Sequence, residues 1–274
     1  MYKYELKQTI LCLDQVSAGY DGKAILKDIN ILEKDVVREG VDATGQIIAV
    51  LGRSGRGKST LFKVLTGLVK PISGRVLITT SEPNCPESAK IVGEGDVGFV
   101  DQKYTLFRHK TVYDIMMYAL KSRKISVVEK KKIIEDNLTT WGLLEHKDKY
   151  PCELSGGQRQ RTAIIEQLLT SKHFVVFDEP ASGLDVGNVK KMKECYELIH
   201  ASDELNTIIF STHDIKLAVE MADMIYVIGF PEGTTDYSTI VGRFDLKEMG
   251  LAWTKLGAKH LDLMEKIEET MLKS

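Results

Sequence analysis

A glycine-rich segment has the residue types and spacing that bind phosphate groups. Residues 52–59, GRSGRGKS, fit the pattern GxxxxGK[ST] and lie between the apolar stretch QIIAVL and the helical pattern KSTLFKVL. Glycines let backbone N–H groups wrap a phosphate chain, and the positive end of the following helix attracts it further. Lys58 is expected to reach the β- and γ-phosphates and Ser59 to bind Mg²⁺. The pattern predicts a nucleoside triphosphate site made by Gly52, Arg53, Ser54, Gly55, Arg56, Gly57, Lys58, Ser59 and Thr60.

Two carboxylates follow another apolar stretch, FVVFDEP. A strand that ends at Asp178 places a carboxylate at the carboxyl edge of a parallel sheet, where ligands of such sheets bind, and this suits a Mg²⁺ ligand. Glu179, one residue further on, points differently and is a candidate for orienting or deprotonating the attacking water. Two acidic residues after a strand are common, so this interpretation depends on the phosphate loop.

A second helix start, LSGGQRQR at residues 154–161, also has features that hold an anion. Ser155 and Gln158 have the spacing of a capping box, in which each side chain bonds a backbone N–H of the other residue. Gly156 and Gly157 let a ligand approach the first exposed N–H groups of the helix. Capping chemistry alone leaves open, and favours, a well-capped helix without any ligand.

The whole string LSGGQ resembles the signature of the ATP-binding cassette family, and it stands between the phosphate loop and the Asp178 strand, as in that family. The resemblance covers about the first 230 residues. VGFVDQKYTLFRHKTVYDI looks like the family's Q-loop with Gln102, SGLD like its D-loop with Asp185, and STHD like its switch histidine, His213. AGYDGKAILKDI places Tyr20 where the family carries an aromatic residue that stacks on adenine.

The resemblance implies that two copies, or one copy and a homologous ATPase, pack head to tail around ATP. Each ATP would lie between the phosphate loop of one copy and the LSGGQ helix of the other. Glu179 would act as general base, and His213 and Gln102 would contact the γ-phosphate, with Gln102 also near Mg²⁺. The partner copy's ATP would meet Ser155, Gly156, Gly157, Gln158 and Asp185.

Several of these residues have plainer interpretations that the sequence leaves open. Asp185 could cap the helix that follows it, and Tyr20 could belong to an ordinary turn. Gln102 could be a polar residue at a strand end, and His213 a histidine without a ligand.

The strands and helices that must position these residues alternate along the chain. Apolar runs predict strands at 47–51, 97–100, 174–178, 207–211 and 224–230, and helical patterns alternate with them at 58–69, 158–169 and 189–201. This pattern predicts an α/β fold with a mostly parallel sheet, the P-loop NTPase core. Residues 1–46 and 74–100 are turn-rich with short alternating strands, which favours an antiparallel β portion beside the core.

The chain is expected to form one domain, 1–274, with three parts. Residues 1–102 and 166–230 form the core with the β portion, residues 103–165 form an inserted helical subdomain that carries LSGGQ, and residues 231–274 form a C-terminal extension. In that extension, His260, Met264, Ile267 and Met271 form an apolar stripe that favours packing on its own domain over contact with a partner.

Two features depart from the family's usual pattern. Residues 32–46 are longer and more charged than the turn that usually precedes the phosphate-loop strand, and an extended hairpin is one interpretation. Glu166 stands where many relatives have arginine, and we expect it to alter the charge near the second anion site.

Composition narrows the function classes. The formal net charge is -2, with no basic stripe, so nucleic acid is excluded as a main partner. The longest apolar runs are strand length, far short of the roughly 20 residues of a membrane-spanning helix. We therefore expect separate transmembrane permease subunits, and a cytoplasmic chain that lies on the cytoplasmic face of the membrane.

The resulting prediction is an ATP-hydrolysing subunit of a transporter. KYPCELSGGQRQR and LFRHKTV look most like the importer branch found in bacteria. The main alternative is a soluble member of the family that acts in repair, translation or cluster assembly. A nonhydrolytic scaffold is disfavoured because Glu179 and His213 are both present.

Overall fold

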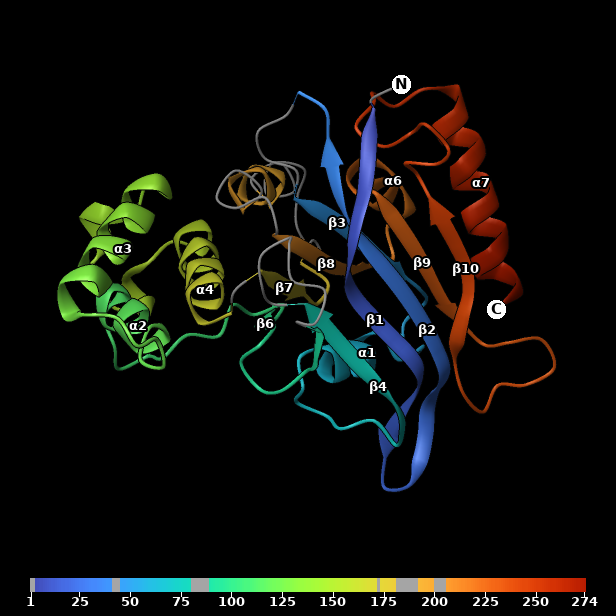
Figure 1. Cartoon of the computed structure of the whole chain (residues 1–274), viewed down its shortest axis with the longest axis horizontal. Coiled ribbons are helices and arrows are strands. Elements are labelled where there is room, and N and C mark those ends of the chain that lie inside the picture. Colours follow the sequence, from blue (N-terminus) through green and yellow to red (C-terminus); the bar gives the residue numbers. More distant parts are fainter. Residues whose placement is uncertain (1–2, 41–44, 80–88, 172, 181–191, 200–205) are drawn as a thin grey trace.

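The structure is a computed structural model that describes residues 3–40, 45–79, 89–171, 173–180, 192–199 and 206–274. The described part contains a six-stranded sheet, a four-stranded sheet and a group of helices to one side of them (Figure 1).

The six-stranded sheet is the α/β core. Its order is β10-β9-β3-β8-β7-β6, and its neighbours pair in parallel except for β10, which is antiparallel to β9. The mostly parallel sheet that the apolar runs predict is therefore confirmed. Its strands are β3 (Gln46–Leu51), β6 (Gly98–Val100), β7 (Phe174–Phe177), β8 (Thr207–Thr212), β9 (Met224–Gly229) and β10 (Thr239–Asp245).

The four-stranded sheet is antiparallel, with the order β2-β1-β4-β5. The sequence was expected to give short strands here, and that expectation is wrong for the first two, which have 17 and 16 residues. Asp21 and Gly22, both at positive φ, form the tight turn between them. The strands are β1 (Tyr4–Tyr20), β2 (Lys23–Arg38), β4 (Ser73–Thr79) and β5 (Ala89–Ile91).

The charged segment 32–46 belongs largely to this long hairpin. Its first half continues β2, where Leu32 pairs with Cys12 and Arg38 pairs with Tyr4. The interpretation as an extended hairpin is confirmed for residues 32–38, and residues 41–44 lie outside the described part of the chain.

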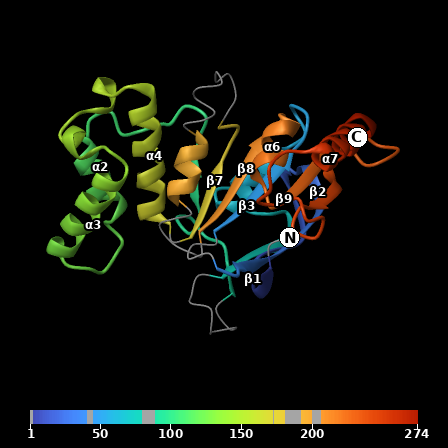
Figure 2. The ribbon, with the colours of Figure 1, turned by 90° about the horizontal axis from the view of Figure 1, so that it is seen from above.

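Both faces of the core sheet are covered, which explains the continuous apolar runs. Ile48 and Val50 of β3 pack with β1, β2 and helix α1 (Lys58–Leu65), whereas Ala49 and Leu51 pack with the helices on the opposite face. Seen from above, the core strands lie between β1 on one side and α6 (Ile215–Met221) on the other (Figure 2).

A separate group of helices contains the LSGGQ segment. Figures 1 and 2 show α2, α3 and α4 together on one side of the two sheets. Helix α4 ends at Thr170, five residues beyond the predicted end of the helical subdomain at residue 165. The subdomain boundaries stay a prediction. The elements are α2 (Val112–Ala119), α3 (Val127–Thr140), η1 (Leu144–His146), η2 (Pro151–Glu153) and α4 (Gly156–Thr170).

The last helix, α7 (Ala258–Lys273), packs on its own chain, as the apolar stripe favours. It buries His260, Leu263, Ile267 and Met271 against β9, β10 and α6, while Met264 is only partly buried. Among the helices of the described residues, none is long and apolar enough to cross a membrane.

Candidate functional site

The phosphate loop joins β3 to α1, as its sequence flanks predict. Gly57 is the N-cap of α1 with φ 90°, and a Cβ there would lie 2.8 Å from Leu26 Cδ2, so only glycine fits. The side chains of Arg53, Ser54 and Ser59 are exposed, whereas Lys58 is 5% exposed. The loop thus presents its backbone and the first turn of α1 to solvent.

Lys58 is held by its own loop and by a carboxylate from another strand. Its Nζ donates hydrogen bonds to the carbonyl oxygens of Gly52 at 2.8 Å and Arg53 at 3.3 Å. The same Nζ lies 3.2 Å from Oε1 of Glu179, which follows β7. These acceptors fix the ammonium group in one place before any phosphate arrives.

Asp178 and Glu179 are positioned by Ser211 of β8. The Ser211 hydroxyl donates to Asp178 Oδ1 at 2.8 Å and accepts from the Glu179 backbone N–H at 2.8 Å. Glu179 has φ 46°, a left-handed conformation that turns its side chain away from that of Asp178. Sequence reasoning missed Ser211, although it is the first residue of the STHD motif.

His213 completes the cluster from the end of β8. Its Nδ1 lies 3.8 Å from Glu179 Oε2, and its side chain is 60% exposed. The next residue, Asp214, caps α6 through Oδ1, which accepts from the Leu217 N–H at 3.0 Å. Lys58, Glu179 and His213, predicted from three distant motifs, therefore meet at the carboxyl ends of three neighbouring strands.

The residues predicted to hold Mg²⁺ suit that ion. Ser59 is exposed in the first turn of α1, and Asp178, directly after β7, keeps a half-buried carboxylate that accepts from the Ser211 hydroxyl. Within the described ranges, no three His, Cys, Asp or Glu side chains gather as metal ligands. Mg²⁺ commonly binds through one or two protein groups and completes its shell with phosphates and water, so a sparse site fits.

Gln102 lies in the loop after β6 with an exposed side chain. Among the described residues, no hydrogen bond joins it to the Lys58 cluster. Its neighbour Tyr104 is more firmly placed: the hydroxyl donates to the Pro180 carbonyl at 3.3 Å and accepts from Gln160 Nε2 at 2.9 Å. Burial raises the pKa of Tyr104 to about 12. Sequence reasoning missed this tyrosine, which connects the loop after β6 to Pro180, after β7, and to Gln160 of α4.

Tyr20 lies at the end of β1 beside α1. Its ring is 41% exposed, and Lys63 Nζ of α1 lies 5.6 Å from the ring centroid. The ring is thus exposed next to the helix that follows the phosphate loop.

The side chain of Arg56, in the phosphate loop, contacts Phe230 and the C-terminal residue Ser274. Its guanidinium lies 3.7 Å from the ring centroid of Phe230, and Nη2 donates to the Ser274 carbonyl at 3.4 Å. The side chain therefore turns toward the end of α7, so phosphate would meet the backbone of Arg56 rather than its guanidinium.

The LSGGQ helix start has the predicted capping box. The Ser155 N–H donates to Gln158 Oε1 at 2.9 Å, and the Gln158 N–H donates to Ser155 Oγ at 3.3 Å. A Cβ added to Gly156 or Gly157 would find nothing within 4 Å. Packing within the described chain does not require this glycine pair, which leaves the helix start open to something that approaches from outside.

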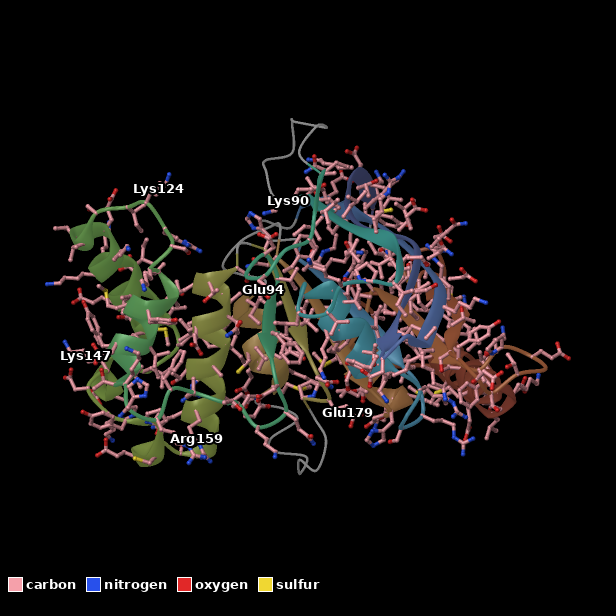
Figure 3. The ribbon with its side chains drawn as sticks, turned by 90° about the horizontal axis from the view of Figure 1, so that it is seen from below. Lys90, Glu94, Lys124, Lys147, Arg159 and Glu179 are labelled. Carbon is pink, nitrogen blue, oxygen red and sulfur yellow. The ribbon has the colours of Figure 1, made fainter. Side chains whose placement is uncertain are left out.

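The two predicted anion sites lie on different parts of the molecule. Figure 3 shows Glu179 of the core and Arg159 of the first turn of α4 along the same lower edge of the view. Among the described residues, no hydrogen bond joins Ser155 or Gly157 to the phosphate loop. Asp185, predicted to reach across a dimer, lies outside the described residues.

Glu166 is not near the second anion site, contrary to the expectation. It lies ten residues along α4 from Gly156, which is about 15 Å along the helix axis. It is 8% exposed and lines a hollow with Phe107 and Tyr118.

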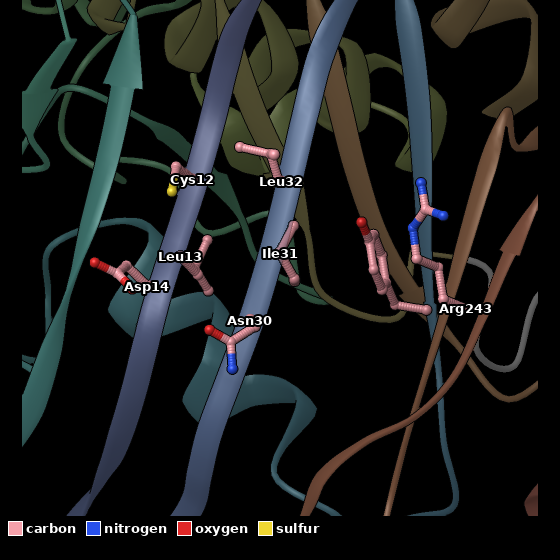
Figure 4. Close-up of a pocket in the computed structure, with 8 residues that line it drawn as sticks. Cys12, Leu13, Asp14, Asn30, Ile31, Leu32 and Arg243 are labelled. Carbon is pink, nitrogen blue, oxygen red and sulfur yellow. The ribbon is translucent and has the colours of Figure 1, made fainter.

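A cavity of about 440 Å³ lies elsewhere and is lined by residues of both sheets; in Figure 4, Arg243 lies to the right of the labelled residues of β1 and β2. Beside it, the Tyr226 hydroxyl and Gln46 Nε2 donate to the carboxylate of Glu33, which is 3% exposed. Burial raises the pKa of Glu33. These hydrogen bonds join β2 of the hairpin to β3 and β9 of the core.

Comparison with known proteins gives consistent matches. A family model described as ABC transporter matches residues 43–182. The arginine transport ATP-binding protein ArtM of Bacillus subtilis is 37% identical over 215 residues, which are 78% of this chain and 85% of that protein. The sulfate/thiosulfate import ATP-binding protein CysA of Synechococcus elongatus is 34% identical over 217 residues, or 79% of this chain.

The chain spans little more than half the length of three such CysA proteins, namely 59%, 54% and 58%. Among solved structures, cbiO1 from Clostridium perfringens, part of the ABC transporter complex cbiONQ, matches with a TM-score of 0.69 and 27% identity. That match covers 96% of this chain and 100% of the other.

Proposed function

This chain belongs to the ABC transporter family, and on that premise we propose that it is the subunit that binds and hydrolyses ATP to power transport across a membrane. The observation that carries the proposal is the meeting of Lys58, Glu179 and His213 at one edge of the parallel sheet, next to the Ser211-bound Asp178. A phosphate loop, a carboxylate pair and a histidine at one edge supply the groups that hydrolysis of a γ-phosphate needs.

The protein groups act mainly by position and charge. The N–H groups of residues 52–60 and the Lys58 ammonium bind the β- and γ-phosphates, and the Tyr20 ring stacks on adenine. Mg²⁺, held by Ser59 and Asp178, neutralises phosphate charge when bound. Glu179 accepts the proton of the attacking water, and His213 contacts the γ-phosphate.

Two molecules complete each site in this proposal. Among the described residues, the open Gly156–Gly157 helix start makes no hydrogen bond to the phosphate loop of its own chain, yet its free N–H groups suit an anion. A second copy, or a homologous ATPase, packed head to tail supplies that anion as the γ-phosphate of its ATP. Closure then depends on ATP, and hydrolysis removes the contact that favours the closed state.

The remaining partner crosses the membrane. The relatives named for sulfate/thiosulfate import and arginine transport support a transporter, with an importer favoured. Separate permease subunits provide the membrane-spanning helices, and this chain acts at the cytoplasmic face. The transported solute is set by those subunits.

The test is phosphate release from MgATP by the purified chain, with and without EDTA in excess of Mg²⁺. We expect Mg²⁺-dependent hydrolysis whose rate per molecule rises with protein concentration, because the active form is a dimer. A chain that binds no MgATP overturns the proposal, and hydrolysis that is independent of concentration overturns its two-molecule part.

A further inference from the structure

Gln158 of the LSGGQ segment is held from outside its own helix by His146. Its Nε2 lies 2.8 Å from Nε2 of His146, the last residue of the short helix η1, and both residues are half-buried. In Figure 3 their chain neighbours Arg159 and Lys147 both lie among the group of helices, apart from Glu179 of the core. This contact joins the capping box of α4 to a second element of the helical group.

The capping box fixes the direction of this hydrogen bond. The Ser155 backbone N–H can only donate, so the amide atom of Gln158 that faces it at 2.9 Å must be the carbonyl oxygen. The other end of the amide, which faces His146, is therefore the NH2 group. Because that group also can only donate, Nε2 of His146 must accept, and the ring does so as the neutral tautomer with its proton on Nδ1. Nδ1 is buried and has no hydrogen-bond partner among the described residues, so none of them competes with Gln158 in setting the tautomer.

The segment that carries His146 is itself bonded to α2. The Lys149 N–H donates to the His146 carbonyl at 3.0 Å. In the first turn of α2, the Val112 N–H donates to the Lys149 carbonyl at 2.9 Å. The next N–H, that of Tyr113, donates to the Lys147 carbonyl at 2.8 Å. His146 thus connects the start of α4 to the start of α2.

Both ends of the Gln158 amide are engaged inside its own chain. Ser155 Oγ accepts from the Gln158 N–H at 3.3 Å, which leaves the hydroxyl proton of Ser155 to donate elsewhere. No backbone carbonyl of the described chain accepts from the N–H groups of Gly156 and Gly157. The free donors of this helix start are therefore the Ser155 hydroxyl and the two glycine N–H groups. The Gln158 side chain supports them and makes no outward contact of its own.

We propose that His146 is a positioning residue for the ATP that the partner molecule binds. By accepting from Gln158, it keeps the amide oriented for the capping box. The capping box in turn keeps the Ser155 hydroxyl and the glycine N–H groups directed at the γ-phosphate. The proposal rests on the function proposed above, and His146 acts through Gln158 rather than by contact with nucleotide.

Loss of the acceptor acts on the helix start more than on the fold. One hydrogen bond between neutral groups contributes only modestly to stability. Without His146, however, the Gln158 amide is free to rotate by half a turn, which would bring its NH2 group against the Ser155 N–H. Two donors would then face each other, and the capping box would open where the phosphate is to be bound.

Three substitutions of His146 separate the hydrogen bond from the space that the ring fills. Glutamine places its oxygen where Nε2 accepts, asparagine places its oxygen near the position of Nδ1, and leucine has no acceptor. We measure MgATP-dependent dimerisation by light scattering in the Glu179→Gln background. His146→Leu and His146→Asn should raise the dimer dissociation constant about tenfold or more, because each dimer contains two such contacts. His146→Gln should stay within about threefold of the parent. His109→Leu, which removes an exposed histidine that precedes α2, is the matched control and should leave dimerisation unchanged.

MgATP affinity of the monomer distinguishes positioning from a general loss of structure. The phosphate loop lies on the core, so each variant should bind MgATP within about twofold of wild type. Equal dimerisation of all three variants and the parent, or equal impairment of all three, overturns the proposal. A loss of MgATP affinity as large as the loss of dimerisation also overturns it, since it would show that the whole chain is disturbed.

The position of the ring proton gives a test that needs no nucleotide. A long-range ¹H–¹⁵N correlation spectrum of the wild-type chain at neutral pH should show His146 protonated at Nδ1 and unprotonated at Nε2, with His146→Gln identifying its signals. A proton on Nε2 overturns the proposal. A wild-type chain that neither binds nor hydrolyses MgATP overturns the proposed function and the role of His146 in it, and the spectrum then still decides whether His146 holds Gln158.

Discussion

Lys58 Nζ lies 3.2 Å from Glu179 Oε1, so the residue that we propose binds phosphate and the carboxylate that we propose activates water are in direct contact. The Lys58 ammonium is buried, and two carbonyl oxygens of its own loop hold it in place. Binding of a phosphate chain therefore changes the surroundings of Glu179 as well as those of Lys58. Substitution of either residue should therefore change the surroundings of the other.

Glu179→Gln is expected to lower hydrolysis of MgATP by about 100-fold or more while binding persists. Glutamine keeps the shape but loses the proton acceptor, and general-base catalysis contributes roughly 10²–10⁴-fold. Removal of the carboxylate also frees Lys58, so MgATP affinity should stay the same or increase. Phosphate release and equilibrium binding measure the two effects. Glu145→Gln, on the exposed surface at η1, is the matched control. Undiminished hydrolysis would show that another group activates the water.

Gly157→Leu is expected to block ATP-dependent dimerisation without harming the fold. A Cβ at Gly157 meets nothing within 4 Å, and leucine favours helix more than glycine does, so the melting temperature should not fall. MgATP affinity of the monomer should stay within about twofold, while hydrolysis drops at least about tenfold. Light scattering in the Glu179→Gln background reports the dimer. Normal dimerisation of the leucine variant refutes the role of the LSGGQ helix.

Tyr20→Ala is expected to weaken MgATP binding about tenfold, and Tyr20→Phe to leave it unchanged. Stacking of a base on an aromatic ring contributes about 1–3 kcal/mol, and phenylalanine keeps the ring. Calorimetric titration with ATP gives the affinities. Tyr118→Ala, which removes an exposed ring of α2, should have no effect on nucleotide affinity. If both Tyr20 variants bind as wild type does, the ring is only part of a turn.

Stability is expected to depend on pH through Asp223. Its carboxylate is 3% exposed and accepts from the Ile47 N–H at 2.8 Å, and burial raises its pKa to about 6. Because the folded protein holds this proton more tightly than the unfolded chain, the contribution of Asp223 to stability falls as pH rises from about 4 to about 6. The wild-type unfolding free energy minus that of Asp223→Asn should therefore decrease by about 2–3 kcal/mol between pH 4 and pH 7. Urea denaturation at several pH values measures it, and a difference that does not change with pH contradicts the assignment.

Tyr226→Phe is expected to destabilise the chain by about 1.5–3 kcal/mol. Its hydroxyl donates to the buried Glu33 carboxylate, and phenylalanine leaves that carboxylate with one donor fewer. Chemical denaturation measures the loss, and the pKa of Glu33 should rise further. Tyr237→Phe, at a less buried tyrosine, should change stability by less than about 0.5 kcal/mol. Equal stability of wild type and Tyr226→Phe would mean that the hydrogen bond makes no net contribution to the free energy of unfolding.

The core strands could be predicted because both of their faces are buried, which leaves continuous apolar runs such as FVVF. The length of β1 could not, since its pairing with β2 shifts register between Leu6 and Thr9 and again between Leu13 and Val16. Each bulge breaks the two-residue alternation, so one long strand reads as several short ones.

The site motifs were recognisable from local spacing, but their contacts were not. Ser211 and Asp178 are 33 positions apart, and only the adjacent placement of β7 and β8 brings the hydroxyl to the carboxylate. Glu166 could be placed on a helix, yet its hollow depends on how α4 packs against α2 and the loop at Phe107. Such contacts depend on tertiary packing and cannot be recognised from local spacing in the sequence.

The Tyr104 hydroxyl, bonded to both Pro180 and Gln160, acts as a mechanical joint. Because one oxygen bonds both the Pro180 carbonyl and the Gln160 side chain of α4, a rotation of α4 relative to β7 would have to stretch or break one of these two hydrogen bonds.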